Sequence, residues 1–378
     1  MKIVSTSIYP LNIPFVESFS HNLSKRNHSD SIVVKVTTES GVSGFGEGVP
    51  RPYVTGETRD ASIAYIRDSL LPQIIGVDLN DLSAENALAD IANLLSTKPS
   101  STEVIWNASL SAVELALTDC FFREKRLSIA EILPPVIQQV SYSGIISSGS
   151  EDKVKKIAQR CKDTGFKHIK MKVTGINDAN MVGTVRNILG ADVSLRLDAN
   201  AAFNCETALE FIKSVEKYNI ASIEQPIPRG DPAKLAALRS SSPIPLMADE
   251  SIVTLQDARD LKDAVDYFNL RLSKCGGFFN TLAIYKYAVS AGIGVQLGCQ
   301  VGETAILSAA GRHLAAHLRE LQFTEGSYST LLLKEDISKE RIIIGTNGNS
   351  DPLTGNGLGI TVQEELLDKY AENKILVH

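Results

Sequence analysis

The chain has 378 residues, of which 43% are hydrophobic and 22% charged, and its formal net charge is −6 at pH 7. This length suits a barrel of roughly 250 residues together with a smaller domain. The composition is that of an ordinary globular protein. It disfavours membrane-spanning proteins, because no apolar run approaches the ~20 residues of a span, and nucleic-acid binders, because Lys and Arg are dispersed along the chain.

The amino terminus and the cysteines indicate the compartment. Residues 1–5 lack the apolar core of a signal peptide. The five cysteines are odd in number and widely spaced, without a Cys-x-x-Cys pair, so free thiols in a reducing compartment are favoured over zinc or disulfide sites. We therefore expect a cytoplasmic protein that binds neither nucleic acid nor a membrane.

The amino-terminal third is predicted to be an α+β domain. Residues 1–14 and 31–48 are rich in β-branched residues and indicate an antiparallel meander. Between them, residues 15–29 are predicted to form a polar loop, and residues 50–58 are turn-rich; loops of this kind are often lids. Residues 61–75, 83–95 and 101–124 carry apolar residues at helical spacing. We predict a capping domain with lid loops over residues 1–127.

From about residue 138 the pattern alternates between strands and helices. Apolar runs occur at residues 140–146, 168–173, 194–198, 221–224, 246–249, 267–273, 294–297 and 321–324. Eight such runs separated by amphipathic stretches indicate a parallel, right-handed (β/α) barrel over residues 138–330. The tail, residues 331–378, repeats no such unit and is expected to return to the amino-terminal meander. The predicted fold class is α/β, a modified TIM barrel with an α+β capping domain.

Charged residues recur once per unit near the carboxyl ends of these strands. Lys172, Asp198, Glu224, Asp249 and Lys274 follow one another at intervals of 26, 26, 25 and 25 residues. Because the carboxyl ends of parallel strands meet at the mouth of a barrel, we expect these charges to share one pocket. A single strand-end Asp would more often cap the next helix, but five charges in register point to a functional site.

The three carboxylates predict a metal site. Carboxylates held together without a cation raise one another's pKa values, and a hard divalent ion removes this conflict. Oxygen ligands without His or Cys select Mg²⁺, with Mn²⁺ as a substitute, over zinc. We predict that Asp198, Glu224 and Asp249 bind Mg²⁺, and that Asn200 and Glu250 orient these ligands through hydrogen bonds.

The lysines predict proton transfer. Lys172 belongs to the second strand and Lys274 to the sixth, so we expect them to face each other across the pocket. A nearby cation and partial burial lower the pKa of a lysine toward that of a base. Lys170, on the same strand face as Lys172, adds to the positive field. This arrangement favours removal of a proton beside a carboxylate.

These motifs resemble a known family. The set Lys-x-Lys, Asp-x-Asn, Glu-Gln-Pro, Ala-Asp-Glu-Ser and Lys-x-Gly-Gly, at these spacings, is similar to the enolase superfamily, specifically its muconate-lactonizing enzyme subgroup of dipeptide epimerases, N-acylamino acid racemases and muconate cycloisomerases. The resemblance implies that the three carboxylates bind Mg²⁺ and that Lys172 and Lys274 are the acid/base pair. It also implies a homo-oligomer.

Substrate contacts are expected from the lid and from segments after the later strands. Gly46-Glu47-Gly48 and residues 55–58 also resemble the family's capping domain, and a loop around residues 15–28 would close over the substrate. The predicted substrate-binding residues are Phe19, His21, Arg26, Tyr53, Gly276, Glu303, Glu325 and Ser327.

The sequence leaves the substrate open. Dipeptide epimerases carry an Asp-x-Asp after strand eight, where this chain has Glu325-Gly326-Ser327, which weakens a dipeptide as substrate. Arg26, with Lys25 and Arg51, would suit a second carboxylate, as in an N-succinyl amino acid or a muconate-like diacid.

Three hypotheses follow. The first is a Mg²⁺-dependent racemase or epimerase that uses 1,1-proton transfer, through a metal-stabilised enolate, on an amino-acid derivative or dipeptide. The alternative keeps the site but makes the enzyme a muconate-type cycloisomerase or an acid-sugar or hydroxy-acid-type dehydratase, similar to o-succinylbenzoate synthase. The third, a barrel that binds a small carboxylate without turnover, is disfavoured because an idle site has no reason to keep both lysines and three carboxylates.

Overall fold

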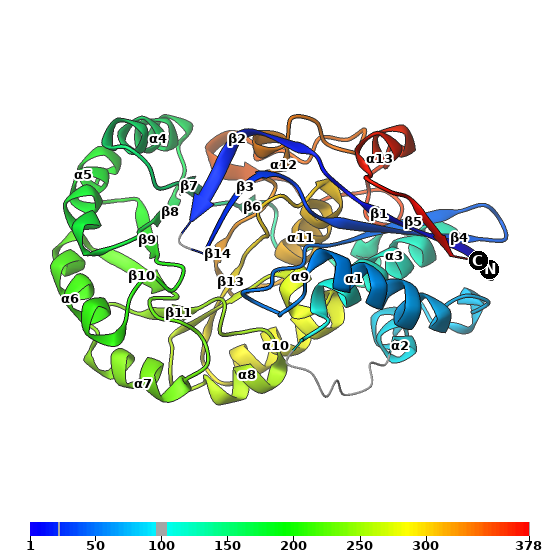
Figure 1. Ribbon diagram of the computed structural model, residues 1–378, viewed down its shortest axis with the longest axis horizontal. Helices are drawn as coiled ribbons and strands as arrows, with labels where there is room; N and C mark the ends of the chain where they lie inside the picture. Colours follow the sequence, from blue (N-terminus) through cyan, green and yellow to red (C-terminus); the bar gives the residue numbers. More distant parts are fainter. Residues whose placement is uncertain (22, 96–103, 378) are drawn as a thin grey trace.

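The computed structural model of the protein describes residues 1–21, 23–95 and 104–377. Helices surround a curved parallel sheet, and a separate antiparallel sheet lies beside it, with the two chain ends close together at its edge (Figure 1). Among the described residues, no helix is long and apolar enough to cross a membrane.

The parallel sheet has eight strands whose spatial order follows the sequence. They are β7 (Gly144–Ile146), β8 (His168–Lys172), β9 (Ser194–Asp198), β10 (Ile220–Glu224), β11 (Leu246–Ala248), β12 (Tyr267–Leu270), β13 (Gly294–Leu297) and β14 (Leu321–Thr324). The two outer strands meet where Ser143 N–H donates to Thr324 O at 2.8 Å. The predicted (β/α) barrel is confirmed.

The barrel helices alternate with these strands. They are α4 (Glu151–Thr164), α5 (Ala179–Leu189), α6 (Cys205–Val215), α7 (Pro232–Ser241), α8 (Leu255–Asp260), α9 (Leu272–Cys275), α10 (Phe278–Ser290), α11 (Ala305–His317) and α12 (Ser329–Leu332). Short polar side chains cap several of them: Ser150, Asn204 and Asp231 each accept a backbone N–H from the first turn that follows. Local sequence therefore defines where these helices begin.

The antiparallel sheet joins the two ends of the chain. Its order is β16 (Ile375–Val377), β1 (Ile3–Pro10), β4 (Ile32–Thr38) and β5 (Ser43–Gly48), and β16 pairs with β1. The long helix α3 (Asn107–Glu124) covers this sheet and contacts β5. Side chains at Gly44, Gly46 or Gly48 would come within 2.1 Å of α3 backbone atoms, so the glycine motif of β5 serves helix packing.

Smaller elements complete the cap and its connections. They are β2 (Pro14–His21), β3 (Ser24–His28), α1 (Arg59–Tyr65), η1 (Ile66–Leu70), η2 (Leu71–Gln73), η3 (Leu79–Asp81), α2 (Ala87–Leu94), η4 (Ile129–Glu131), β6 (Val140–Ser141), η5 (Ile176–Asp178), η6 (Glu216–Tyr218), η7 (Thr346–Gly348), β15 (Asn349–Ser350) and α13 (Glu364–Tyr370). Strands β6 and β15 pair antiparallel outside the barrel sheet.

Three predicted boundaries were wrong. The predicted loop at residues 15–29 is the hairpin β2–β3, whose polar residues hid the strand pattern. The predicted first barrel strand divides into β6 and β7, and the strand expected at residues 267–273 ends at Leu270. Partners from distant segments determine these ends, and a local pattern does not reveal them.

Candidate active site

Consecutive strand ends place a lysine and two carboxylates side by side. Lys172 is the register partner of Asp198, and Asp198 is the partner of Glu224. Asp249 follows Ala248, the last residue of β11. All three carboxylates are buried. The regular spacing along the chain thus becomes direct proximity at the mouth of the barrel.

Lysine ammonium groups hold the first two carboxylates. Lys172 Nζ lies 2.9 Å from Asp198 Oδ2. Lys170 Nζ lies 3.3 Å from Asp198 Oδ2 and 3.4 Å from Glu224 Oε2. Burial alone would raise the pKa of Asp198, but the two lysine charges outweigh it and lower that pKa. Burial and the neighbouring Asp198 charge raise the pKa of Glu224 to about 8. At Glu224, therefore, burial and the Asp198 charge outweigh the opposing charge of Lys170.

Arg271 contacts the other side of this cluster. Because β12 ends at Leu270, Arg271 is the residue at the end of the sixth strand. Its Nη2 donates to Asp249 Oδ2 and lies 3.5 Å from Glu224 Oε1, and its Nη1 is 3.3 Å from Gln300 Oε1. Burial opposes the charge of Asp249, but the charges of Arg271 and Lys274 lower its pKa.

Lys274 is not at a strand end, which corrects the prediction. It lies on the short helix α9, and its side chain is fully buried at 0% exposure. Its Nζ donates to Asp249 O, Asp249 Oδ1 and Asn269 O at 2.6, 2.7 and 2.6 Å. An ammonium has three N–H donors, so all are used within the protein. Lys274 thus contacts the third carboxylate directly, and its role as the second acid/base stays a prediction.

The donor chemistry of the cluster fits a hard divalent cation, because three buried carboxylates supply only oxygen. The described residues contain no group of three or more His, Cys, Asp or Glu already spaced around a common metal position. The cause is visible in the contacts: Lys170 stands between Asp198 and Glu224, and Arg271 between Glu224 and Asp249. A divalent cation bound to these oxygens would take the place of these lysine and arginine contacts.

The two predicted orienting residues contact the cluster and each other. Asn200 Oδ1 accepts from Lys172 Nζ at 2.5 Å, and its Nδ2 donates to Glu250 Oε1 at 3.1 Å. Burial, followed by the charge of Asp249, raises the pKa of Glu250 to about 7. Asn200 has φ 40°, as the chain turns sharply after β9. Such backbone strain is common where a side chain must be aimed at a site.

Glu325 lies inside the barrel. Its carboxylate accepts from Lys170 Nζ at 2.7 Å and from Arg196 Nη2 at 2.9 Å. Burial would raise its pKa, but these two cations lower it. Glu325 is thus paired within the protein. Ser327 is also occupied, because its Oγ accepts from Arg312 Nη2 at 2.9 Å.

The lid residues reach the site to different degrees. The ring centroid of Phe19, on β2, is 5.9 Å from Lys172 Nζ. Burial raises the pKa of Tyr53, and the charges of Arg51, Arg26 and Arg271 oppose this rise. Arg26 pairs with Asp30. The side chain of His21 lies outside the described residues.

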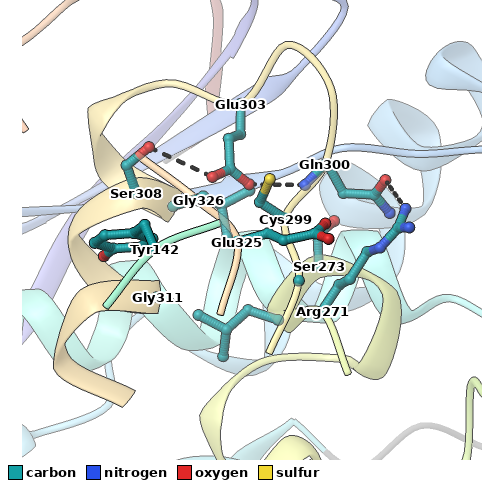
Figure 2. A pocket seen from close by; sticks show the side chains of 13 residues that line it. Tyr142, Arg271, Ser273, Cys299, Gln300, Glu303, Ser308, Gly311, Glu325 and Gly326 are labelled. Carbon is teal, nitrogen blue, oxygen red and sulfur yellow. Dashed lines mark hydrogen bonds between the residues drawn. The ribbon is translucent and has the colours of Figure 1, made fainter. Parts of the chain in front are cut away.

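A small pocket adjoins the cluster on the Arg271 side. Its lining includes Arg271, Cys299, Gln300, Glu303 and Glu325, and Figure 2 shows the Arg271 guanidinium reaching toward Gln300. Glu303 accepts from Gln300 N–H at 2.9 Å and from Ser308 Oγ at 3.4 Å, and burial raises its pKa to about 8. The carboxyl group of Glu303 therefore lines this pocket.

The glycine pair after Lys274 faces the cap. A Cβ on Gly276 would meet Asn280 Nδ2 at 2.9 Å and Asn107 Oδ1 at 3.0 Å, and one on Gly277 would meet Glu114 Oε2 at 2.3 Å. Gly276 is absent from the lining of the pocket beside Arg271, so its predicted substrate contact is not seen there. These glycines make room for α3.

Sequence reasoning missed several polar residues of the cluster. Asn269 Nδ2 and Gln296 Nε2 donate to Glu224 at 2.8 and 3.2 Å. Arg196 and Arg271 are the other two. Arg196 is two residues before Asp198 on the same strand, so the two-residue period of β-strands was the available signal. For Arg271, the available signal was its position two residues after Asn269, which gives it the same side of the strand.

Two family models match the chain: "Mandelate racemase / muconate lactonizing enzyme, N-terminal domain" over residues 4–134, and "Enolase C-terminal domain-like" over residues 153–366. The hydrophobic dipeptide epimerase of Enterococcus faecalis is 32% identical over 320 residues, which cover 84% of this chain and 87% of that protein.

Two solved structures cover the whole chain and are covered completely by it. The N-succinyl Arg/Lys racemase from Bacillus cereus superposes with a TM-score of 0.89 at 25% identity. The dipeptide epimerase from Cytophaga hutchinsonii, complexed with Mg and the dipeptide D-Ala-L-Val, superposes with a TM-score of 0.88 at 27% identity.

Proposed function

The chain belongs to the mandelate racemase/muconate lactonizing enzyme family of the enolase superfamily and is an isomerase, and we propose that it inverts the α-carbon of an N-acyl amino acid or a dipeptide. The reaction is a 1,1-proton transfer beside the substrate carboxylate. The names of the similar proteins favour this chemistry over cycloisomerisation or dehydration.

The position of Lys172 carries the proposal. Its Nζ lies beside the carboxylate cluster, its side chain is 8% exposed, and the lid residue Phe19 lies over it. A substrate held between the lid and the cluster would present its α-carbon to this nitrogen, which removes the proton. Lys170, held by Glu325, adds positive charge beneath the substrate carboxylate.

We propose that Asp198, Glu224 and Asp249 hold Mg²⁺, with Mn²⁺ as a substitute. Bound Mg²⁺ would supply Lewis-acid polarisation of the substrate carboxylate and so acidify the neighbouring C–H. Three buried oxygen donors and the raised pKa of Glu224 support this assignment. Asn200 and Glu250 keep Lys172 and the cluster in orientation through the hydrogen bonds described above.

We propose that the nitrogen of the substrate is acylated and is not a free ammonium group. Glu325, the carboxylate nearest to the position of the Asp-x-Asp of dipeptide epimerases, is already paired with two protein cations. Arg51 and Arg26, both paired with Asp30 in the lid region, would suit a carboxylate on the acyl group. N-succinyl amino acids are therefore the first candidates, and dipeptides the second.

Proton NMR in D₂O tests the function. The purified enzyme with Mg²⁺ is incubated with N-succinyl and N-acetyl amino acids of both configurations and with dipeptides, and loss of the α-proton signal is followed. We expect exchange and inversion in at least one class. No exchange across the panel would exclude the proposed function, and an absorbance change with muconate or hydroxy-acid substrates would favour the alternative reactions.

Three further predictions remain proposals. We propose that residues 1–127 with 331–378 act as the cap and residues 138–330 as the catalytic barrel. We also propose a homo-oligomer, which size-exclusion chromatography with light scattering would test. A cytoplasmic location is proposed from the five free cysteines among the described residues, and fractionation of cells producing the protein would test it.

A further inference from the structure

We propose that Asn269 and Gln296 are positioning residues that hold the Glu224 carboxylate ready for a divalent cation. The inference rests on the proposed metal site and leaves the predicted acid/base roles of Lys172 and Lys274 unchanged. It assigns to the two amides a task that the charged side chains around Glu224 do not perform, which is to stay in contact with the carboxylate while a cation is bound.

Two neighbouring strands bring the amides to the same carboxylate. Asn269 on β12 and Gln296 on β13 are register partners in the parallel sheet, and both are fully buried. Asn269 Nδ2 donates to Glu224 Oε1 at 2.8 Å, and Gln296 Nε2 donates to Glu224 Oε2 at 3.2 Å. Each oxygen of the carboxylate therefore has one amide donor, and both donors come from the barrel sheet itself.

The other partners of Glu224 carry a positive charge. Lys170 Nζ lies 3.4 Å from both carboxylate oxygens, and Arg271 Nη2 lies 3.5 Å from Oε1. A divalent cation on these oxygens repels an ammonium or guanidinium group, but a neutral amide carries no net charge to repel. Each carboxylate oxygen can accept more than one partner, so an amide N–H and a cation can share it. The amides are thus the partners that can remain when the cation binds.

The two amides are poorly suited to a purely structural role. Asn269 Oδ1 and Gln296 Oε1 are buried and have no hydrogen-bond partner among the described residues. A buried polar atom without a partner lowers stability, and an apolar side chain of similar shape removes that cost. Leu at position 269 and Met at position 296 would fill the same space. Polar groups kept at a cost to stability are expected where a site needs them.

Gly298 fixes the direction of the Asn269 amide. A Cβ at residue 298 would lie 2.3 Å from Asn269 Oδ1 and 3.1 Å from Nδ2. Gly298 is not among the glycines with positive φ, so its backbone conformation does not require glycine, whereas the close approach of the amide does. The amide oxygen occupies the space that a side chain at 298 would fill, and the nitrogen is thereby turned toward Glu224.

Metal titration without substrate tests the proposal. We would prepare N269L and Q296M, which keep the approximate size of each side chain and remove its donors. Both are titrated with Mn²⁺, whose free ion is followed by electron paramagnetic resonance, and with Mg²⁺ as competitor. Loss of a hydrogen bond to a metal ligand typically weakens metal binding by about 10–100-fold. We expect a loss in this range for N269L and a smaller loss for Q296M, whose hydrogen bond is longer.

Thermal melting separates positioning from a structural role. Without metal, N269L and Q296M should melt at or above the wild-type temperature, because each substitution removes a buried oxygen that has no partner among the described residues. At one fixed Mg²⁺ concentration, the wild type should gain more stability than either variant. Variants that melt well below the wild type without metal, yet bind Mn²⁺ as tightly, would show that the amides serve the fold and would overturn the proposal.

A double-mutant cycle tests the part played by Gly298. G298A removes no polar group but pushes the Asn269 amide aside, so it should weaken Mn²⁺ binding about as much as N269L does. In an N269A background the space beside residue 298 is open, and adding G298A should have no further effect on the affinity. Additive losses from N269A and G298A would contradict the packing argument, even if N269L fails to fold.

S222A is the matched control. Ser222 lies two residues before Glu224 on β10, is fully buried, and its Oγ has no partner among the described residues. Its Mn²⁺ affinity should equal that of the wild type. Unchanged affinity in N269L, Q296M and G298A, or an equal loss in S222A, would overturn the proposal, as would a wild type that binds neither ion. Because no substrate is used, these outcomes are distinct from a failure of the proposed function, which the exchange panel in D₂O reveals.

Discussion

Two sets of buried carboxylates in this molecule have opposite kinds of partner. Glu47 and Glu114 extend from the cap into the barrel, and we call them the seam carboxylates. Glu47 accepts from Thr304 N–H at 2.9 Å and Leu307 N–H at 3.1 Å, where α11 begins. Glu114 accepts from Phe278 N–H at 3.0 Å and Phe279 N–H at 2.9 Å, where α10 begins. Their partners are backbone donors that cannot move away.

The mouth carboxylates, Asp198, Glu224 and Asp249, are equally buried but are held mainly by lysine and arginine side chains. Long side chains can rotate away when another cation or a substrate arrives, whereas helix amino termini cannot. Equally buried carboxylates therefore join the cap to the barrel at the seam, whereas at the mouth they form a site whose partners can be exchanged. Burial of a carboxylate alone does not identify an active site; the mobility of its partners does.

The largest expected effect concerns the mouth. K172A should reduce α-proton exchange by about 10³-fold, because a positioned base contributes roughly 10²–10⁴-fold. Proton NMR in D₂O measures this, and thermal melting checks that the fold is retained. Exchange within a few fold of the wild type would show that another group removes the proton and would remove Lys172 from the mechanism.

The second prediction exchanges a mouth carboxylate for its amide. E224Q should weaken Mg²⁺ binding by at least about 10-fold, or about 1.4 kcal/mol, because it removes one proposed ligand. Without metal, its melting temperature should stay close to that of the wild type, since the raised pKa of Glu224 means that the carboxyl already gains little from its charge there. Calorimetry and melting measure the two effects. Unchanged Mg²⁺ affinity would contradict the metal assignment.

The third prediction concerns a seam carboxylate, for which we expect lower stability and unchanged metal binding. E114A should lower the free energy of unfolding by about 1–3 kcal/mol, because it leaves two buried N–H groups at the start of α10 without partners. Its Mg²⁺ affinity should match that of the wild type. Urea unfolding followed by circular dichroism gives the first quantity. A larger change in metal affinity than in stability would break the distinction between seam and mouth.

The last prediction is a dependence of stability on pH. Burial raises the pKa of Glu47 and of Glu114 to about 7, above their ordinary value of 4.5. Between these values the folded state keeps protons that the unfolded state has lost, so the free energy of unfolding falls as pH rises from about 4.5 to 7 and levels off above. E114Q should flatten this slope in urea unfolding at several pH values. An unaltered slope would show that other groups cause it.

Much of the fold and the core of the site were predictable because they depend on local periods. The strand–helix alternation repeats with the length of one unit, and it places Lys172, Asp198 and Glu224 at consecutive strand ends. Parallel strands in sequence order then bring these residues together without further information. The carboxylates could also be identified as candidate metal ligands from the sequence, because residue type alone shows that they offer oxygen donors.

The tertiary structure decided which polar side chains surround these carboxylates. The sequence by itself placed Lys274 near the end of the sixth strand and assigned no role to Arg271. Hydrogen bonding between β12 and β13 ends with the pair Leu270 and Leu297, and this puts Arg271 at the mouth and Lys274 one turn further, beneath Asp249. Strand ends depend on partners far along the chain. Only the folded sheet, therefore, could show that Arg271 and Lys274 both contact Asp249.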